Sequence, residues 1–410
     1  MTAQIATIVQ RAHFPPIPPA VKAALLPFLL SRGLIALLAA VLNQLVVLKH
    51  LPALNVIHPG AMTPLTTAWD AAWYIGIAHD GYDVSATANV QHNYQFFPLL
   101  PRLMRVIAGP GRSLDDYGLV GMVINHLAFG AALILLYQLT ADVFADAGLA
   151  RRAVWVLALA PGAFVCSMVY SEPLFLCCSL LAFWAAWRSG QAHRWVAVGW
   201  STLALLGVAT TTLTRAPGLA LAPAISWLFF QRRPRPGGGR RLALALLPLI
   251  VTLATFGGWV LYVGWRTGSP LAALQAGPAW GPGIGTDLHQ RLSSANPLIW
   301  QYGVLQVVFL GGWVALSLGL ALLRHPPPAP AGLATSDLGS FRLYALGLLL
   351  TVTQAPAAFA AWRYALVSFP CIWVLARLPL SRVLGGVLLA GSLVGQGLLF
   401  WLAMIAPWTP

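Results

Sequence analysis

Long apolar stretches recur along this 410-residue chain, and they constrain its fold more than any other feature. About 20 mostly apolar residues are enough to cross a bilayer as a helix, and such stretches run from Pro27–Leu48 to Val387–Met404. Hydrophobic residues make up 59% of the chain, charged residues only 8%, and the mean hydropathy is +0.76. These values exclude a soluble protein. We therefore predict an all-α polytopic membrane protein.

The positions of the basic residues predict the number and direction of the membrane spans, because cytoplasmic loops carry an excess of Lys and Arg. The assignment of spans that places most basic residues on one side has fifteen of the 24 Lys and Arg inside and eight outside, with Arg32 within a span. It requires eleven spans, at about 23–48, 117–139, 152–168, 173–187, 196–213, 217–230, 242–265, 299–323, 342–358, 364–376 and 383–405. The amino terminus and the loop 231–241 are then cytoplasmic, and most acidic residues lie outside.

We predict one membrane domain, 1–410, with two larger extracytoplasmic loops, 49–116 and 266–298. The first loop is expected to contain interfacial helices. The net charge of +14 would suggest nucleic acid in a soluble protein, but here it reflects topology, and no nucleic-acid partner is expected. No nucleotide-binding loop, zinc motif or catalytic-triad order is present, so we expect neither a cofactor nor a metal.

The segment Thr67–Tyr82 is the most informative candidate site. If it is helical, Asp70, Trp73, Tyr74 and Ile77 share one face. A carboxylate among aromatic rings suits sugar binding, because the rings stack on the sugar and the carboxylate accepts hydroxyl protons. An ordinary aromatic belt at the membrane interface explains the same pattern.

Arginines near the predicted outer surface are candidates for binding a lipid phosphate. Arg102 and Arg105 lie in a predicted interfacial helix, 95–107, and Arg363 with Tyr364 lies at the outer end of a late span. The planar guanidinium group matches phosphate oxygens. Simple anchoring in the lipid headgroups is the alternative.

Glu172, the only glutamate, lies at the tip of a predicted helical hairpin, 152–187, and Arg215 lies at the tip of the next, 196–230. A carboxylate at a span boundary needs a partner or a polar cavity. It can also be stabilised by the helix dipole, and an ion pair between Glu172 and Arg215 would give both residues a purely structural role.

Together these motifs resemble the GPI mannosyltransferase 2 (PIG-V type) family, within the GT-C class of membrane glycosyltransferases. The resemblance rests on an ordered set of motifs: Trp69-Asp70, Trp73-Tyr74, Gly81-Tyr82, Phe96-Phe97-Pro98 with Pro101, Ser171 to Phe175, Thr214-Arg215 with Gly218, Gly268–Trp280, and Arg363-Tyr364 with Pro370.

The resemblance implies a GT-C-like bundle that transfers mannose, with inversion, from a polyprenyl (dolichyl-type) phosphate carrier to an acceptor hydroxyl on the extracytoplasmic face. The acceptor, a glycolipid, glycan or protein, stays open. We expect a bacterial inner-membrane enzyme among membrane lipids. Asp70 would be the general base; Trp69, Trp73, Tyr74, Glu172 and Arg215 would bind sugar or acceptor; and Arg102, Arg105, Arg363 and Tyr364 would hold the lipid phosphate.

Two other functions compete with this interpretation. A transporter or lipid flippase would line a path through the bundle with ionisable residues near the middle of several spans. The chain offers chiefly Arg32 there. A non-catalytic subunit of a GT-C-like complex is also compatible with the fold, because a fold does not guarantee an activity.

Overall fold

The structure, a computed structural model, describes residues 17–49, 64–87, 90–232, 238–275, 277–280, 284–323, 338–353 and 361–405, and every element within these ranges is a helix. The elements up to the second hairpin are α2 (Pro19–Lys49), α3 (Pro64–Thr67), α4 (Asp70–Asp80), η1 (Asn93–Gln95), α5 (Leu99–Ala108), α6 (Leu114–Phe144), α7 (Ala147–Leu159), η2 (Pro161–Ser167), α8 (Glu172–Ser189) and α9 (Arg194–Thr212). They are followed by η3 (Ala216–Ala220), α10 (Leu221–Arg232), α11 (Gly238–Thr267), α12 (Ala272–Gln275), η4 (Gly277–Trp280), α13 (Ile284–Leu292), α14 (Pro297–Leu322), α15 (Gly339–Thr353), α16 (Ala361–Val367), α17 (Pro370–Ala376) and α18 (Arg382–Ile405).

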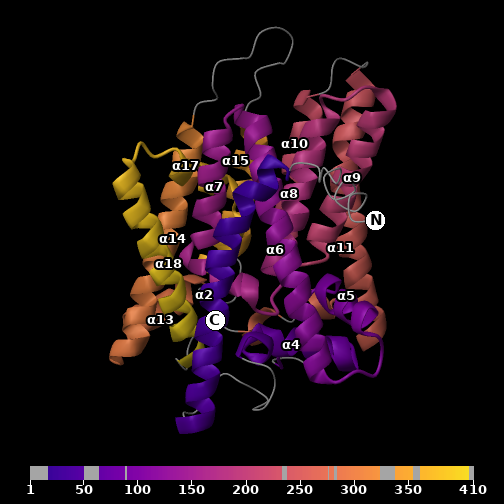
Figure 1. Cartoon of the computed structure of the whole chain (residues 1–410). Coiled ribbons are helices and arrows are strands. Elements are labelled where there is room, and N and C mark those ends of the chain that lie inside the picture. Colours follow the sequence, from indigo (N-terminus) through magenta and orange to yellow (C-terminus); the bar gives the residue numbers. More distant parts are fainter. Residues whose placement is uncertain are drawn as a thin grey trace, which may run out of the picture.

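The long helices run side by side, and α4, α5 and α13 lie at one end of the bundle, the lower end in Figure 1. Six helices are long and apolar enough to cross a membrane: Pro19–Leu45, Leu114–Phe144, Trp195–Thr212, Leu242–Thr267, Ile299–Leu322 and Arg382–Met404. The prediction of an all-α polytopic membrane protein is therefore confirmed. The number of eleven spans is not confirmed, because the described helices at 173–187, 217–230 and 342–353 do not meet the length and hydropathy of a full span. Residues 354–358 of the span predicted at 342–358 lie outside the described residues.

Two predicted spans are broken, and a proline begins the second piece of each. The span predicted at 152–168 consists of α7 and η2, which meet at an angle of 73° before Pro161. The span predicted at 364–376 consists of α16 and α17, and α17 begins at Pro370. Proline disfavours a helical conformation in the preceding residue, and Ala160 before Pro161 has ψ 137°, so α7 ends there. Phe369 before Pro370 has helical angles, so Pro370 begins α17 without accounting for the end of α16. If the bent pair counts as one span, the described residues contain up to seven.

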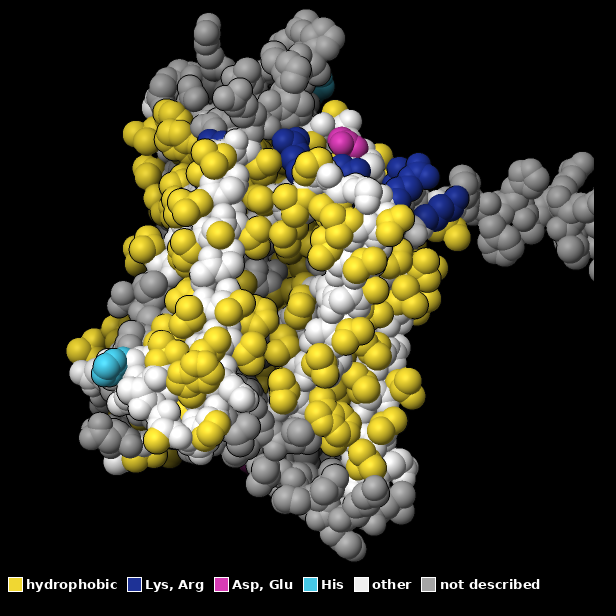
Figure 2. Space-filling view, turned by 90° about the vertical axis from the view of Figure 1, so that its left-hand side faces the viewer, with side chains coloured by type: hydrophobic (Ala, Val, Ile, Leu, Met, Phe, Trp, Pro, Cys, Tyr) yellow, Lys and Arg dark blue, Asp and Glu magenta, His cyan; other side chains and the backbone are white. Residues whose placement is uncertain are grey.

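Side chains on the outside of the bundle are apolar, as expected for contact with lipid. Leu253, Leu318 and Val387 are each more than 60% exposed. On the face seen in Figure 2, hydrophobic side chains cover most of the height, while Lys and Arg gather at the upper end, opposite α4 and α13. Part of the predicted cytoplasmic loop 231–241 and residues 50–63 of the first predicted outer loop lie outside the described residues.

Small residues let α8 and α9 approach closely, and this contact fixes the two hairpin tips relative to each other. A Cβ placed on Gly207 of α9 would lie 2.8–2.9 Å from atoms of Ala182 of α8, two of them backbone atoms. Close backbone contact at small residues is a general feature of helix packing in membranes. Gly199 lies on the same helix, but a Cβ there would meet nothing within 4 Å.

We predict that Gly207→Val destabilises the folded protein, because α8 cannot move aside without disturbing the bundle. Overpacking of this kind costs about 1–3 kcal/mol, which thermal unfolding of the detergent-solubilised protein would detect as a lower Tm. Gly199→Val is the matched control on the same helix and should change Tm little. Equal effects of the two variants would contradict the packing argument.

Candidate active site

Four charged side chains from four distant segments meet in one cluster. An Nη of Arg363 lies 2.7 Å from a carboxylate oxygen of Asp70, and Nε of Arg363 lies 2.7 Å from Oε1 of Glu172. Arg215 pairs with the same oxygen of Glu172. The signs alternate along the chain of contacts, so the two carboxylates and two guanidinium groups cancel. The ion pair weighed for Glu172 and Arg215 from their hairpin positions is present, and Arg363 extends it to Asp70.

Local structure holds each member at its place. Glu172 is the first residue of α8 and precedes Pro173, so its carboxylate lies at the positive end of a helix. The segment before it is fixed by Asn125 of α6, whose amide nitrogen donates to the carbonyls of Met168 and Tyr170 at 2.5 and 2.7 Å. Asp70 is likewise the first residue of α4.

Aromatic residues support both arginines. The guanidinium carbon of Arg363 lies 4.7 Å from the ring centroid of Tyr170, and that of Arg215 lies 4.8 Å from the ring of Tyr364. An Nη of Arg215 also donates to the hydroxyl of Tyr364 at 3.1 Å. Stacking on a ring face stabilises a cation in a site with little water. The arginines are therefore held by rings as well as by carboxylates.

The four side chains of the cluster differ in their exposure to solvent. The side chains of Glu172 and Arg363 are 1% and 3% exposed, that of Arg215 is 14% exposed, and that of Asp70 is 24% exposed. Within the described part of the chain, Arg363 is the only hydrogen-bond partner of the Asp70 carboxylate, and it contacts Oδ2. Oδ1 is therefore free to accept a proton or a hydrogen bond, and Asp70 is the member that a substrate can reach.

The residue before Asp70 has an unusual backbone. Trp69 has φ 58°, in the left-handed region that bulky residues rarely adopt. Its indole N–H donates to the carbonyl of Ala403 in α18 at 2.8 Å. The contact ties the start of α4 to the last membrane helix, so Asp70 is positioned from both sides: by Trp69 through the backbone and by Arg363 through the side chain.

The predicted face of α4 is largely occupied by protein contacts. Tyr74 and Ile77 are buried, and Trp73 stacks on Phe96 with ring centroids 5.6 Å apart. Burial raises the pKa of Tyr74, so its hydroxyl keeps its proton and donates to Ser171 at 2.8 Å. Helix formation from Asp70 agrees with the predicted pattern, while sugar stacking on these rings stays a prediction.

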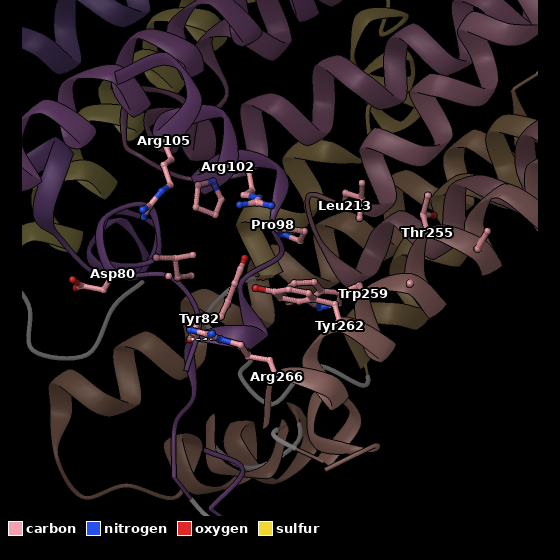
Figure 3. A pocket seen from close by; sticks show the side chains of 15 residues that line it. Asp80, Tyr82, Pro98, Arg102, Arg105, Leu213, Thr255, Trp259, Tyr262 and Arg266 are labelled. Carbon is pink, nitrogen blue, oxygen red and sulfur yellow. Dashed lines mark hydrogen bonds between the residues drawn. The ribbon is translucent and has the colours of Figure 1, made fainter. Parts of the chain in front are cut away.

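Arg102 and Arg105 are not part of this cluster. They line a cavity of about 590 Å³ between α4, α5 and α11, together with Asp80, Tyr82 and Arg266 (Figure 3). Arg105 donates to the carbonyls of Ala78 and His79 and so caps the end of α4. The structure thus brings together Asp70, Glu172, Arg215, Arg363, Tyr364 and Tyr74 of the predicted site residues, and it places Arg102 and Arg105 elsewhere.

Several residues of the two sites were not predicted. Asn125 is a lone amide in an apolar helix, which is a signal for a buried polar contact. On α11, Trp259, Tyr262 and Arg266 follow one another at helical spacing toward the end of a span. That pattern marks a shared face, but an aromatic belt gives the same pattern.

The helical bundle and the buried charge cluster at the helix ends define a polytopic membrane protein with a preformed polar site. Residues 23–225 match the family model described as Mannosyltransferase (PIG-V), and this region contains Asp70, Glu172 and Arg215. Over that region, which is just under half of the chain, the sequence is similar to the PIG-V mannosyltransferases.

Solved structures of an oligosaccharyltransferase from Archaeoglobus fulgidus are similar to this chain. The form tethered to an acceptor peptide shares 13% identity at a TM-score of 0.42, covering 93% of this chain and 56% of that one. AglB in complex with an inhibitory peptide and a dolichol-phosphate shares 15% identity at a TM-score of 0.43, covering 94% and 54%. The chain thus spans about half the length of these enzymes. No curated protein matches the chain.

We predict that Arg363→Ala lowers the stability of the protein strongly. The change leaves Asp70 without its ion-pair partner and Glu172 with one arginine only, and removing one member of a buried ion pair costs about 3–5 kcal/mol. Thermal unfolding in detergent measures the effect. Arg102→Ala is the control, since Arg102 is exposed and forms no ion pair within the described residues. Equal Tm values for the two variants would refute a structural role for Arg363.

Proposed function

We propose that this membrane protein is a glycosyltransferase that moves mannose from a polyprenyl phosphate carrier to an acceptor hydroxyl on the extracytoplasmic face. The observation that carries the proposal is the partly exposed carboxylate of Asp70, which is held by the buried Arg363 and has no hydrogen bond from another described side chain at its second oxygen. The family match supports the mannosyl transfer. Glycolipid, glycan and protein hydroxyls are all compatible acceptors.

The proposed reaction is a single displacement at the sugar C1 atom. The acceptor oxygen forms a bond to C1 while its proton passes to Oδ1 of Asp70, and the bond between C1 and the phosphate oxygen breaks. The bonding electrons leave with the polyprenyl phosphate. Because the acceptor attacks from the side opposite the leaving group, the configuration at C1 inverts.

A phosphate leaving group needs little help from a general acid, but the charge that develops on it needs stabilisation. Arginines meet this need, and the predicted phosphate-binding residues are Arg102, Arg105 and Arg363 with Tyr364. Glu172 and Arg215 act in this proposal mainly by holding Arg363 and Tyr364 in place. Trp69, Trp73 and Tyr74 shape the wall of the site beside Asp70.

The central test replaces the proton acceptor. Asp70→Asn keeps the shape and a hydrogen-bonding oxygen but cannot take a proton at neutral pH. We expect the loss of a general base to slow single-turnover mannosyl transfer by roughly 10²–10⁴-fold, with donor binding preserved. Asp115→Asn, at an exposed position in the first turn of α6, is the control and should keep the wild-type rate.

Wild-type rates in Asp70→Asn would refute the base role. A wild-type protein that moves mannose-loaded polyprenyl phosphate across a vesicle membrane, without releasing free polyprenyl phosphate, would instead support a flippase.

The sidedness can be tested with single cysteines in a background lacking Cys166, Cys177, Cys178 and Cys371. Ser85 follows α4, and His193 lies between α8 and α9; both are exposed. We expect an impermeant thiol reagent added to intact cells to label Ser85→Cys and to leave His193→Cys unlabelled until the cells are opened. The reverse pattern would place Asp70 on the cytoplasmic side.

A further inference from the structure

The cavity beside the charge cluster is a groove along one stripe of α11. The α11 residues that line it follow helical spacing: Ala254, Thr255, Gly258, Trp259, Tyr262 and Arg266. From Ala254 to Arg266 the helix rises about 18 Å, and all of this length belongs to the membrane span Leu242–Thr267. The groove therefore runs from the end of a membrane helix into the apolar part of the bundle.

Polarity changes along this groove. At one end lie Arg102, Arg105 and Arg266 with Asp80, and Figure 3 shows these side chains around the ring of Tyr82. At the other end lie Ala254, Gly258 and Leu213. A Cβ placed on Gly258 would meet nothing within 4 Å, so the floor of the groove is open there. An amphiphile with an anionic head and an apolar chain matches this gradient.

The arginines at the polar end differ in what already holds them. Arg105 donates to the carbonyls that end α4, and Arg266 donates to the carbonyl of Tyr82 at 3.2 and 3.3 Å. The guanidinium group of Arg102 is exposed and has neither a hydrogen bond nor an ion pair to any described residue. Asp80 is exposed and contacts His79. Three cations against one carboxylate leave this end of the groove positive, with Arg102 free to bind a phosphate.

The groove and the charge cluster share a wall. The hydroxyl of Tyr82 donates to the carbonyl of Phe96, and the ring of Phe96 contacts the ring of Tyr74 at 5.1 Å between centroids. Leu213, which lines the groove, lies two residues before Arg215 in the chain. Tyr74 lies on the same helix as Asp70, so this wall connects the groove with the helix that carries the proposed base.

We infer that this groove binds the polyprenyl monophosphate part of the donor, with the phosphate at Arg102 and the first isoprenoid units along Ala254 and Gly258. The inference rests on the proposed function and assigns the donor phosphate to Arg102 rather than Arg363. The charge of Arg363 is already balanced by two carboxylates, whereas Arg102 forms no ion pair with a described residue. Trp259 and Tyr262 lie where aromatic rings are favoured, near the end of a membrane helix.

Binding of farnesyl phosphate to the detergent-solubilised full chain tests the assignment, in two matched pairs of variants. Arg102→Gln removes the free cation, while Arg112→Gln changes an exposed arginine beyond α5. Gly258→Leu fills the floor of the groove, while Gly257→Leu changes the adjacent residue, which does not line the groove and also has open space at its Cβ. Arg102→Gln and Gly258→Leu should each weaken binding roughly tenfold or more, as expected for a lost charge-assisted contact or a blocked chain site.

Wild-type affinity in both Arg102→Gln and Gly258→Leu, with melting temperatures like those of their controls, would overturn the inference. Competition by phosphatidylglycerol as strong as that by farnesyl phosphate would also overturn it, because the groove would then be a general phospholipid site. Farnesol should compete weakly if the phosphate is recognised. Groove-dependent binding in a wild-type protein that transfers no mannose would leave the groove assigned and refute the proposed function instead.

Discussion

Glu172 is the residue on which the arrangement of the site depends. Its carboxylate is almost fully buried at the start of α8, where an unpaired charge would be very costly. One of its oxygens therefore holds two arginines, Arg215 from the next hairpin and Arg363 from a segment 191 residues away. Satisfying this single buried charge joins three parts of the bundle, and Arg363 then holds Asp70 at the accessible edge.

The neutrality of the cluster has a consequence for the proposed reaction. Two carboxylates balance two arginines before the reaction, so the site holds its charges without an excess of either sign. When Asp70 takes the acceptor proton, the cluster becomes positive by one unit. In the proposed transfer this happens as negative charge develops on the departing phosphate, so the proton that leaves the acceptor also improves the electrostatic environment of the leaving group.

The helical membrane architecture could be predicted from sequence because the length and hydropathy of each apolar stretch are local properties of the sequence. Pairing of Glu172 with Arg215 could be anticipated, since both lie at the tips of adjacent hairpins. The contact between Arg363 and Asp70 could not, because it joins residues 293 apart and depends on how all the intervening helices pack. The breaks before Pro161 and Pro370 were missed because the residues on both sides are apolar, and apolarity does not show where a span bends.

The groove was hidden from sequence analysis for a related reason. Its floor, Ala254 and Gly258, consists of small apolar residues that are typical of any membrane span. They line a groove only because α11 lies apart from α4 and α5 at this point. The charge cluster around Asp70 and the groove at Arg102 differ in how firmly their charged groups are held, as their proposed roles require. Fixed charges and the Trp69 contact with α18 hold Asp70 in place, as catalysis by a positioned base demands. A carrier that enters from the bilayer needs the opposite: an open groove with one cation not yet neutralised, and Arg102 is that cation.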